Sequence, residues 1–289
     1  DQVNAAVQLG IRAAFLNSTL SSLEKYEISQ IYQRGGLDLL YLAPERLQHP
    51  ETLVLLETTR ISLVAVDEAH CVSQWGHNFR PDYLKLAGFA RQYEAERVLA
   101  LTATATPRVL DDICAGFDIR PEHAVRTGFY RANLVLRAKP VSAAGRDEAL
   151  LTTLAEQPPG PTIVYVTLQR TAEDVARRLQ QAGLTARAYH AGMKDEERGQ
   201  VQDWFMASGS AVVVATIAFG MGVDKADIRC VCHYNLPKSL ENYAQEIGRA
   251  GRDGGDALCH TLVCTDDLTV LENFVYGDTP DPGSVRDLV

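Results

Sequence analysis

The chain lacks long hydrophobic runs: no apolar stretch among its 289 residues approaches the ~20 residues that a transmembrane helix requires. Its first residues, DQVNAA, contain neither the basic region nor the apolar region of a secretory signal peptide. They also lack a starting methionine, and we expect the true beginning of the protein to lie upstream. These absences argue against a membrane protein and favour a cytoplasmic one, associated with the nucleoid if the source is bacterial.

Positive charge is also scarce. The formal net charge is −9, and only six of the 28 basic residues are lysines, which argues against a general basic coat for nucleic acid. Any nucleic-acid contact must therefore be local and made by selected residues. Arginine suits bidentate contacts with phosphate, although genome composition explains the arginine bias equally well.

Paired C-x₂-C motifs are absent among the six cysteines, so the sequence gives little support for a zinc site. Cys230, Cys232 and Cys259 lie in apolar runs, where a small buried side chain is the simpler interpretation. Reduced thiols fit a cytosolic compartment.

Strand-like and helix-like segments alternate in two series, which is typical of parallel sheets covered on both faces by helices. We predict an α/β protein with a first domain at 1–127, an inter-domain linker at 128–145, a second domain at 146–275 and a connector at 276–289. The linker is placed where the rhythm breaks. The expected strands cover residues 11–16, 37–42, 61–66 and 98–101, then 162–166, 186–189, 211–215, 229–233 and 257–264.

Helix-start signals support this pattern. Ser21 and Glu24 form a capping box for a helix that Gly35 and Gly36 end, and Pro81 and Pro107 suit the first turns of two others.

Residues 63–70 read LVAVDEAH, an apolar strand that ends in two adjacent carboxylates. Ligands of parallel α/β proteins bind outside the carboxyl ends of the strands. Asp67 is suited to hold Mg²⁺ through water, because magnesium prefers one or two carboxylates and retained waters. Glu68 is suited to orient or deprotonate the water that attacks a γ-phosphate. The alternative is a solvated acidic turn.

Two further strand ends carry small residues. The hydroxyl groups of Thr102 and Thr104 can form hydrogen bonds across a cleft, although the same turn could simply cap the following helix. In the run ATIAFGMGVD at 215–224, Gly220 and Gly222 permit close backbone approach to a ligand. Asp224 could accept a hydrogen bond from a ribose hydroxyl or pair with an arginine. A lone Gly-x-Gly is weak evidence for a nucleotide site.

The run QEIGRAGRDG at 245–254 combines arginine with glycine. On a helix, Gln245, Arg249 and Arg252 would share one face and aim two guanidiniums at a single target. Arginines near a transferring phosphoryl group accelerate the reaction ~10³–10⁵-fold where measured. The alternative is two solvated arginines paired with Glu246 and Asp253, which leaves the glycines unexplained.

The segment after the acidic pair, CVSQWGHNFR at 71–80, mixes aromatic and cationic residues in a polar setting. Single-stranded nucleic acid needs such a mixture, because bases stack on rings and phosphates meet arginine. Trp75, Phe79 and Arg80 are the candidates. The alternative is a loop that buries Trp75 and Phe79 in the core.

Taken in order, these motifs resemble the helicase core of the RecQ family, ATP-driven 3′-to-5′ DNA helicases of superfamily 2. The resemblance covers residues 1 to about 274 and rests also on YLAPERL at 41–47 and HAGM at 190–193. It implies two RecA-like domains, the first incomplete, with ATP and Mg²⁺ held between them and a hinge motion about 128–145. The aromatic-rich segment distinguishes RecQ from other DEAH-containing motors.

The resemblance also implies roles for individual residues. Asp67 would serve Mg²⁺ and Glu68 the attacking water, while His70 would link hydrolysis to DNA binding. The γ-phosphate would be reached by Gln245, Arg249 and Arg252, with Arg252 as the arginine finger. The residues expected to contact DNA are Pro44, Glu45, Arg46, Trp75, Phe79, Arg80, Thr102, Thr104, His190 and Thr216.

Two departures from the family pattern are large: the phosphate-binding loop G-x-x-x-x-G-K-[ST] is absent, and the chain ends before the family's zinc-binding and winged-helix regions. The family carries this loop upstream, and its zinc-binding and winged-helix regions downstream, so we interpret the chain as a core fragment that is inactive alone. The partners implied are single-stranded and duplex DNA, with a monomeric state and a single-strand-binding protein as a further partner, in DNA repair and recombination. Two alternatives stay open: an RNA-directed superfamily 2 motor, and a nucleic-acid-binding module without ATPase activity.

Overall fold

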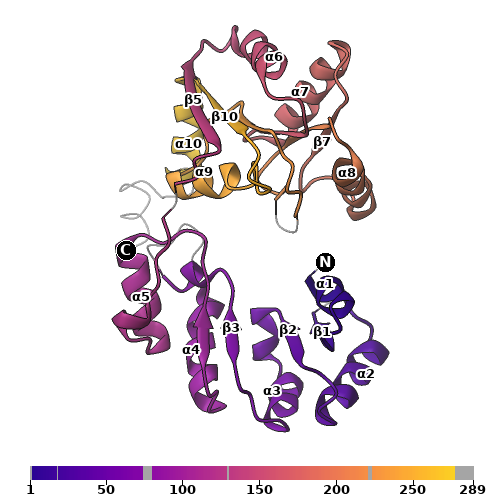
Figure 1. Cartoon of the computed structure of the whole chain (residues 1–289), viewed down its shortest axis with the longest axis vertical. Helices are drawn as coiled ribbons and strands as arrows, with labels where there is room; N and C mark the ends of the chain where they lie inside the picture. The colour runs from indigo at the N-terminus through magenta and orange to yellow at the C-terminus, as the bar shows by residue number, and fades with distance from the viewer. Residues whose placement is uncertain (1, 18, 74–79, 129, 221–222, 277–289) are drawn as a thin grey trace, which may run out of the picture. The chain divides into compact units, whose positions relative to one another are not determined.

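The structure is a computed structural model that describes residues 2–17, 19–73, 80–128, 130–220 and 223–276. The chain divides into two compact units, Asp1–Thr127 and Gly128–Val289 (Figure 1). No helix among the described residues is both long and apolar enough to cross a membrane.

The first unit is an alternation of short parallel strands and helices. Its strands are β1 (Ala13–Leu16), β2 (Leu39–Leu42), β3 (Val64–Val66) and β4 (Val98–Ala100). Its α-helices are α1 (Gln2–Gln8), α2 (Ser22–Gln33), α3 (Pro50–Glu57), α4 (Pro81–Gln92) and α5 (Pro107–Phe117), with 3₁₀ turns η1 (Pro44–Gln48), η2 (Ala69–Val72) and η3 (Pro121–His123). Within the described residues the strands form two separate parallel pairs, β1–β2 and β3–β4.

Local signals set these elements. Ser21 Oγ accepts a hydrogen bond from Glu24 N (3.3 Å) and Glu24 Oε2 accepts one from Ser21 N (2.8 Å), which confirms the predicted capping box. Pro81 and Pro107 occupy the first turns of α4 and α5, as predicted. Strands β1 to β3 begin two or three residues later than predicted; at β1 and β2, Arg12 and Asp38 form an exposed ion pair where the ladder starts.

The second unit contains one six-stranded parallel sheet with the order β5-β10-β9-β6-β8-β7. Its strands are β5 (Leu134–Pro140), β6 (Thr162–Tyr165), β7 (Ala186–Tyr189), β8 (Val212–Ala215), β9 (Cys230–His233) and β10 (Ala257–Val263). Its helices are α6 (Arg146–Glu156), α7 (Gln169–Gln181), α8 (Asp195–Ala207), α9 (Leu240–Ile247) and α10 (Asp266–Tyr276).

Side chains from successive residues of this sheet enter two different cores. Val164 packs in a cluster with residues of α6 and α7, whereas Ile163 packs in a cluster with Val201 and Phe205 of α8. The sheet is therefore buried on both faces, which explains why its central strands are nearly all apolar.

Strand β5 corrects the prediction for residues 128–145, part of which is not a linker. Residues 134–140 pair in parallel with β10 along its whole length, and Figure 1 shows the two strands side by side. The strand has no clear apolar pattern because it lies at the sheet edge, where Val135 and Leu136 are half-exposed and charged Arg137 and Lys139 are tolerated. Pro140 also fits an edge position.

Replacing Phe205 by Ala should lower the free energy of unfolding of the second unit by about 3–5 kcal/mol. The ring is fully buried and packs edge-on against Phe219, with a centroid separation of 5.4 Å. Urea unfolding followed by circular dichroism measures the loss, and the partly exposed neighbour Met206→Ala is the control. A loss equal to that of the control would contradict the packing described.

Candidate functional site

The acidic pair lies at the carboxyl end of β3, as predicted from the sequence. Asp67 and Glu68 follow the strand directly, and both are exposed. Asp67 Oδ1 accepts a hydrogen bond from Glu68 N (2.8 Å). The next turn is tied to the neighbouring strand, because Ala69 N donates to Leu101 O (2.8 Å). The carboxylates are thus presented by a turn anchored on both strands of the pair.

The backbone of Glu68 is left-handed, with φ 51° and ψ 40°. Residues with a side chain rarely adopt this region, and those that do cluster at functional sites. The conformation turns the Glu68 side chain back toward η2, where its Oε2 lies 3.2 Å from His70 Nδ1.

His70 joins the acidic pair to the threonine turn after β4. The ring is 2% exposed, and its Nδ1 lies 3.0 Å from Thr102 Oγ1. Burial alone would lower the pKa of His70, but Cys71 and Glu68 outweigh it and raise the pKa to about 9. Thr102 Oγ1 donates to Thr104 O (3.1 Å), which leaves it to accept from the protonated Nδ1 of His70. Glu68, His70 and Thr102 therefore form one continuous chain of contacts.

The threonine turn has little to do with capping the next helix. The N-cap of α5 is Thr106, whose hydroxyl accepts from Val109 N (3.3 Å). Thr104 is buried, and its Oγ1 has no hydrogen-bond partner among the described residues.

In the second unit, the two arginines of the 245–254 run both bind the glycine-rich segment after β8. Arg249 Nη1 donates to Gly220 O, and Arg252 Nη1 lies 2.9 Å from Asp224 Oδ1. A side chain at residue 220 would have to displace the Arg249 guanidinium, so Gly220 leaves room for this contact. The pairing of Asp224 with an arginine, one of two possibilities in the sequence, is the one observed.

The predicted helical face of Gln245, Arg249 and Arg252 is wrong. Helix α9 ends at Ile247, and both arginines lie in the turn that follows. The helix stops because Gly248 forms its C-cap and Gly251 has a φ of +53°.

The solvated-arginine alternative is also wrong, because its two acidic partners are otherwise engaged. Glu246 binds His233 Nε2 (2.7 Å), and Asp253 binds Arg229.

Comparison with known proteins identifies the family. Residues 1–113 match the family model described as DEAD/DEAH box helicase, and residues 145–254 match that of the helicase conserved C-terminal domain. The ATP-dependent DNA helicase RecQ of Bacillus subtilis is 42% identical over 289 residues, which cover 100% of this chain and 49% of that protein. The chain belongs to the RecQ family. A RecQ of Pasteurella multocida is 39% identical over 257 residues, covering 88% of this chain and 40% of that protein.

The chain thus spans about half the length of the Bacillus subtilis relative. Solved structures resemble it in fold. Yeast Dbp5 bound to RNA and ADP BeF3 superimposes with a TM-score of 0.67 at 17% identity, covering 96% of this chain and 72% of that one. Mss116p bound to ssRNA and AMP-PNP gives 0.65 at 16% identity, covering 96% and 59%. These likenesses confirm the predicted two-domain, RecA-like α/β fold.

Two of the predicted DNA contacts lie at neighbouring strand ends in the RecQ second unit. His190 follows β7 and Thr216 follows β8, and Thr216 N donates to Tyr189 O (3.2 Å). His190 is buried, with Nε2 3.2 Å from Glu173 Oε1 and no partner for Nδ1 among the described residues. Their contact with DNA stays a prediction.

In the RecQ first unit, Pro44, Glu45 and Arg46 form the start of η1. The Arg46 guanidinium is mostly buried: Nη2 donates to Thr52 Oγ1 (3.1 Å) and Glu51 Oε1 (3.2 Å). It lines a cavity of about 300 Å³ together with residues of α2 and α3. Its predicted position along the DNA backbone is not tested by this arrangement.

The aromatic-rich segment of this RecQ chain falls largely outside the described residues, which exclude Trp75 and Phe79, and Gly222 is excluded as well. Arg80 is described: it is exposed, and its N donates to Cys71 O (3.0 Å) just before α4. Because of this bond, the two ends of the segment meet beside His70.

A magnesium ion fits the donor set at Asp67. Among the described residues no group of three or more His, Cys, Asp or Glu side chains is arranged to hold a metal. Magnesium needs no such group, because it keeps several waters and takes one or two carboxylates plus substrate phosphates. Asp67 offers an exposed carboxylate with one oxygen held by its own turn.

Arg131 and Asn133, which hold the arginine turn of the second unit, carry no clear sequence signal of this role. Both lie in the stretch 128–145, which has no clear periodicity. Their partners are 117–122 residues away along the chain, so no local pattern could reveal the contacts. The only available signal was an arginine and an asparagine directly before an apolar run.

Proposed function

We propose that the chain forms the motor core of a RecQ-type DNA helicase, which hydrolyses ATP to move 3′ to 5′ along one DNA strand and separate the duplex. The observation that carries this proposal is the contact chain from Glu68 through His70 to Thr102. It joins a candidate water-activating carboxylate to the base of the predicted strand-sensing segment. The ATP-dependent DNA helicases named among the relatives support the same activity.

The first unit would supply the acid–base chemistry. Asp67 would hold Mg²⁺ through water, and the ion would neutralise charge that develops on the phosphates. Glu68 would take a proton from the attacking water as the bond between the β- and γ-phosphates breaks. Protonated His70 would hold the Glu68 carboxylate in place until water binds.

The second unit would supply positive charge to the transferred phosphoryl group. Arg252 reaches solvent, and exposed Asp224 is its one ion-pair partner among the described residues, so it is the better candidate for the arginine finger. Arg249 is bound to the Gly220 carbonyl and would fix the glycine-rich segment against the turn. Gln245, at the end of α9, would complete this set.

Strand sensing would run through His70. Two candidates for DNA contact lie near it: Thr102, which contacts the ring, and Arg80, the last residue of the aromatic-rich segment, whose N donates to Cys71 O. Binding of a strand there would shift the His70–Glu68 contact and so alter hydrolysis. The same route gives Trp75 and Phe79 their proposed role as stacking platforms.

The solved structures of similar fold, Dbp5 and Mss116p, are bound to RNA, so the DNA preference is to be tested against RNA. In a protein that joins this chain to a phosphate-binding loop, single-stranded DNA should stimulate ATP hydrolysis more than RNA of the same sequence. Equal or stronger stimulation by RNA would favour the RNA-directed motor. Nucleic-acid binding with no hydrolysis under either condition would favour the module without ATPase activity.

We further propose a monomer that acts in the cytoplasm on single-stranded and duplex DNA, in repair and recombination, with a single-strand-binding protein as partner. The names of the relatives support the DNA substrate.

A further inference from the structure

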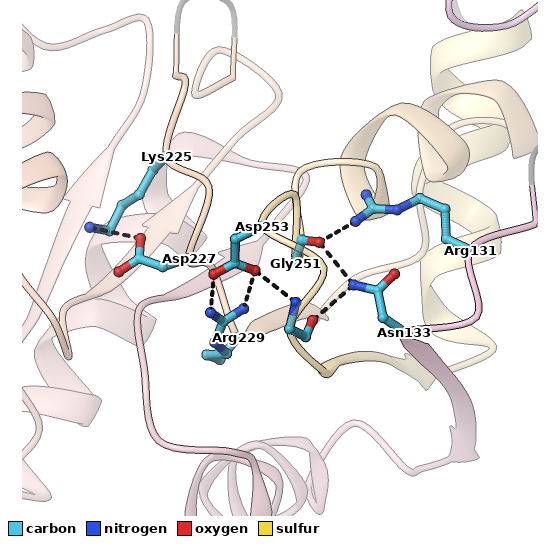
Figure 2. Close-up of polar contacts among 8 residues, drawn as sticks. Arg131, Asn133, Lys225, Asp227, Arg229, Gly251 and Asp253 are labelled. Carbon is cyan, nitrogen blue, oxygen red and sulfur yellow. Dashed lines mark hydrogen bonds and ion pairs between the residues drawn. The ribbon is translucent and has the colours of Figure 1, made fainter.

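The turn at residues 248–255, which carries Arg249 and Arg252, is gripped by side chains from outside it (Figure 2). Arg131 Nη1 donates to Gly248 O (3.2 Å), and its Nη2 donates to Gly251 O. Asn133 Nδ2 donates to Gly251 O (2.8 Å) and to Gly255 O (2.8 Å). Four carbonyl contacts from two side chains thus bind one short turn.

The centre of the turn has no space for a side chain at residue 251. A Cβ at Gly251 would lie 2.5 Å from Gly255 O and 2.6 Å from Asn133 Nδ2. The turn is also tied to the sheet, because Gly251 N donates to Ile228 O (2.8 Å). The Asn133 amide therefore fits between the carbonyl oxygens of Gly251 and Gly255, an arrangement that leaves room for glycine alone at residue 251.

An ion pair holds the far side of the turn. Arg229 forms a two-pronged contact with Asp253, one arm of which is 3.0 Å long, and Asp253 Oδ1 also accepts from Gly255 N (2.9 Å). The hydrogen bond from Arg229 lowers the pKa of Asp253 to about 2. The pair is therefore ionised throughout the neutral range.

Arg131 and Asn133 act on the backbone of the 248–255 turn from a position close to the boundary between the two units. They follow the boundary between the two units at Thr127 and precede β5. Their donors face main-chain carbonyls of the turn, so their effect is on the backbone that carries the arginines.

We propose that Arg131 and Asn133 are positioning residues for hydrolysis: they hold the 248–255 turn so that Arg252 is presented to the phosphate. This inference rests on the proposed function of Arg252. Misplacement of a catalytic group by about 1 Å costs on the order of 100-fold in rate. We therefore expect Asn133→Ala to lower kcat about 10- to 100-fold with little change in KM for ATP.

The variants should form a graded series in a protein that joins this chain to a phosphate-binding loop. Asn133→Asp has the same shape but offers carboxylate oxygens to the two carbonyls, so its loss should exceed that of Asn133→Ala. Arg131→Lys keeps the charge but not the fork that spans two carbonyls, and should lower kcat as well. The matched control is Gln180→Ala, which removes an amide donor to Ala186 O (2.7 Å) elsewhere in the unit.

A double-mutant cycle separates this inference from the function on which it rests. If Asn133 acts through Arg252, Asn133→Ala should cost little once Arg252→Ala is present. Equal losses with and without Arg252 would overturn the inference. Wild-type turnover by Arg252→Ala alone would instead overturn the proposed role of Arg252.

Hydrogen exchange on the 289-residue chain tests whether Arg131 and Asn133 hold the 248–255 turn, and it requires no measurement of ATP hydrolysis. The amides of Gly251 and Asp253, which donate to Ile228 O and Ala226 O, should exchange faster in Asn133→Ala than in the control. Unchanged exchange would contradict the grip. If Asn133→Ala does not fold, Arg131→Lys provides the same two comparisons.

Discussion

Replacing Glu68 by Gln should abolish DNA-stimulated ATP hydrolysis while leaving ATP binding intact, in a protein that joins this chain to a phosphate-binding loop. Loss of a positioned general base costs roughly 10²–10⁴-fold in rate. The amide keeps the size of the side chain and so preserves the turn after β3, but it cannot take a proton from water. Steady-state turnover and equilibrium binding of a fluorescent ATP analogue measure the two quantities separately.

Two observations would make this result specific. The exposed Glu122, which pairs with Arg120, is the matched control, and Glu122→Gln should leave turnover unchanged. In Glu68→Gln the pKa of His70 should also fall from about 9, because one of the two groups that raise it has lost its charge. Retained hydrolysis with a lowered His70 pKa would show that the contact exists but that Glu68 is not the base.

Replacing Arg252 by Ala should reduce turnover by roughly 10³–10⁵-fold, the range measured for arginine fingers. The guanidinium is partly exposed and pairs with exposed Asp224, so its removal should cost little stability. Arg252→Lys should recover only part of the rate, because an ammonium cannot make the bidentate contact with phosphate. Single-turnover hydrolysis with saturating DNA is the appropriate measurement.

The control for Arg252 is Arg177, an exposed arginine of the same unit that pairs with Asp174. Arg177→Ala should retain full activity. If the losses in Arg252→Ala came from unfolding, its thermal midpoint would fall well below that of Arg177→Ala. Matched midpoints with unequal turnover would place the effect in the reaction.

The sequence predicted best those features that depend on neighbours along the chain. Apolar runs marked the central strands, Ser21 and Glu24 marked the start of α2, and the order of strand and acidic pair placed Asp67 and Glu68 at a strand end. Each of these follows from local periodicity, capping or connectivity. The resemblance to RecQ proteins rested on the same local motifs.

The errors share a different cause. Strand β5 was missed because an edge strand need not be apolar, and its identity depends on pairing with β10 more than 100 residues later. The prediction that Arg249 and Arg252 share a helical face was wrong because it used their spacing alone. Helix α9 ends before them, at Gly248, and Gly251 adopts a left-handed conformation. Both arginines nevertheless converge on one segment, residues 220–224.

The left-handed backbone of Glu68 lowers the stability of the fold at the residue that we propose as the general base. A residue with a Cβ costs roughly 1–2 kcal/mol there, which glycine would avoid. A library screened only for heat resistance would therefore favour glycine at residue 68, and under the role proposed for Glu68 the selected proteins would have lost ATP hydrolysis.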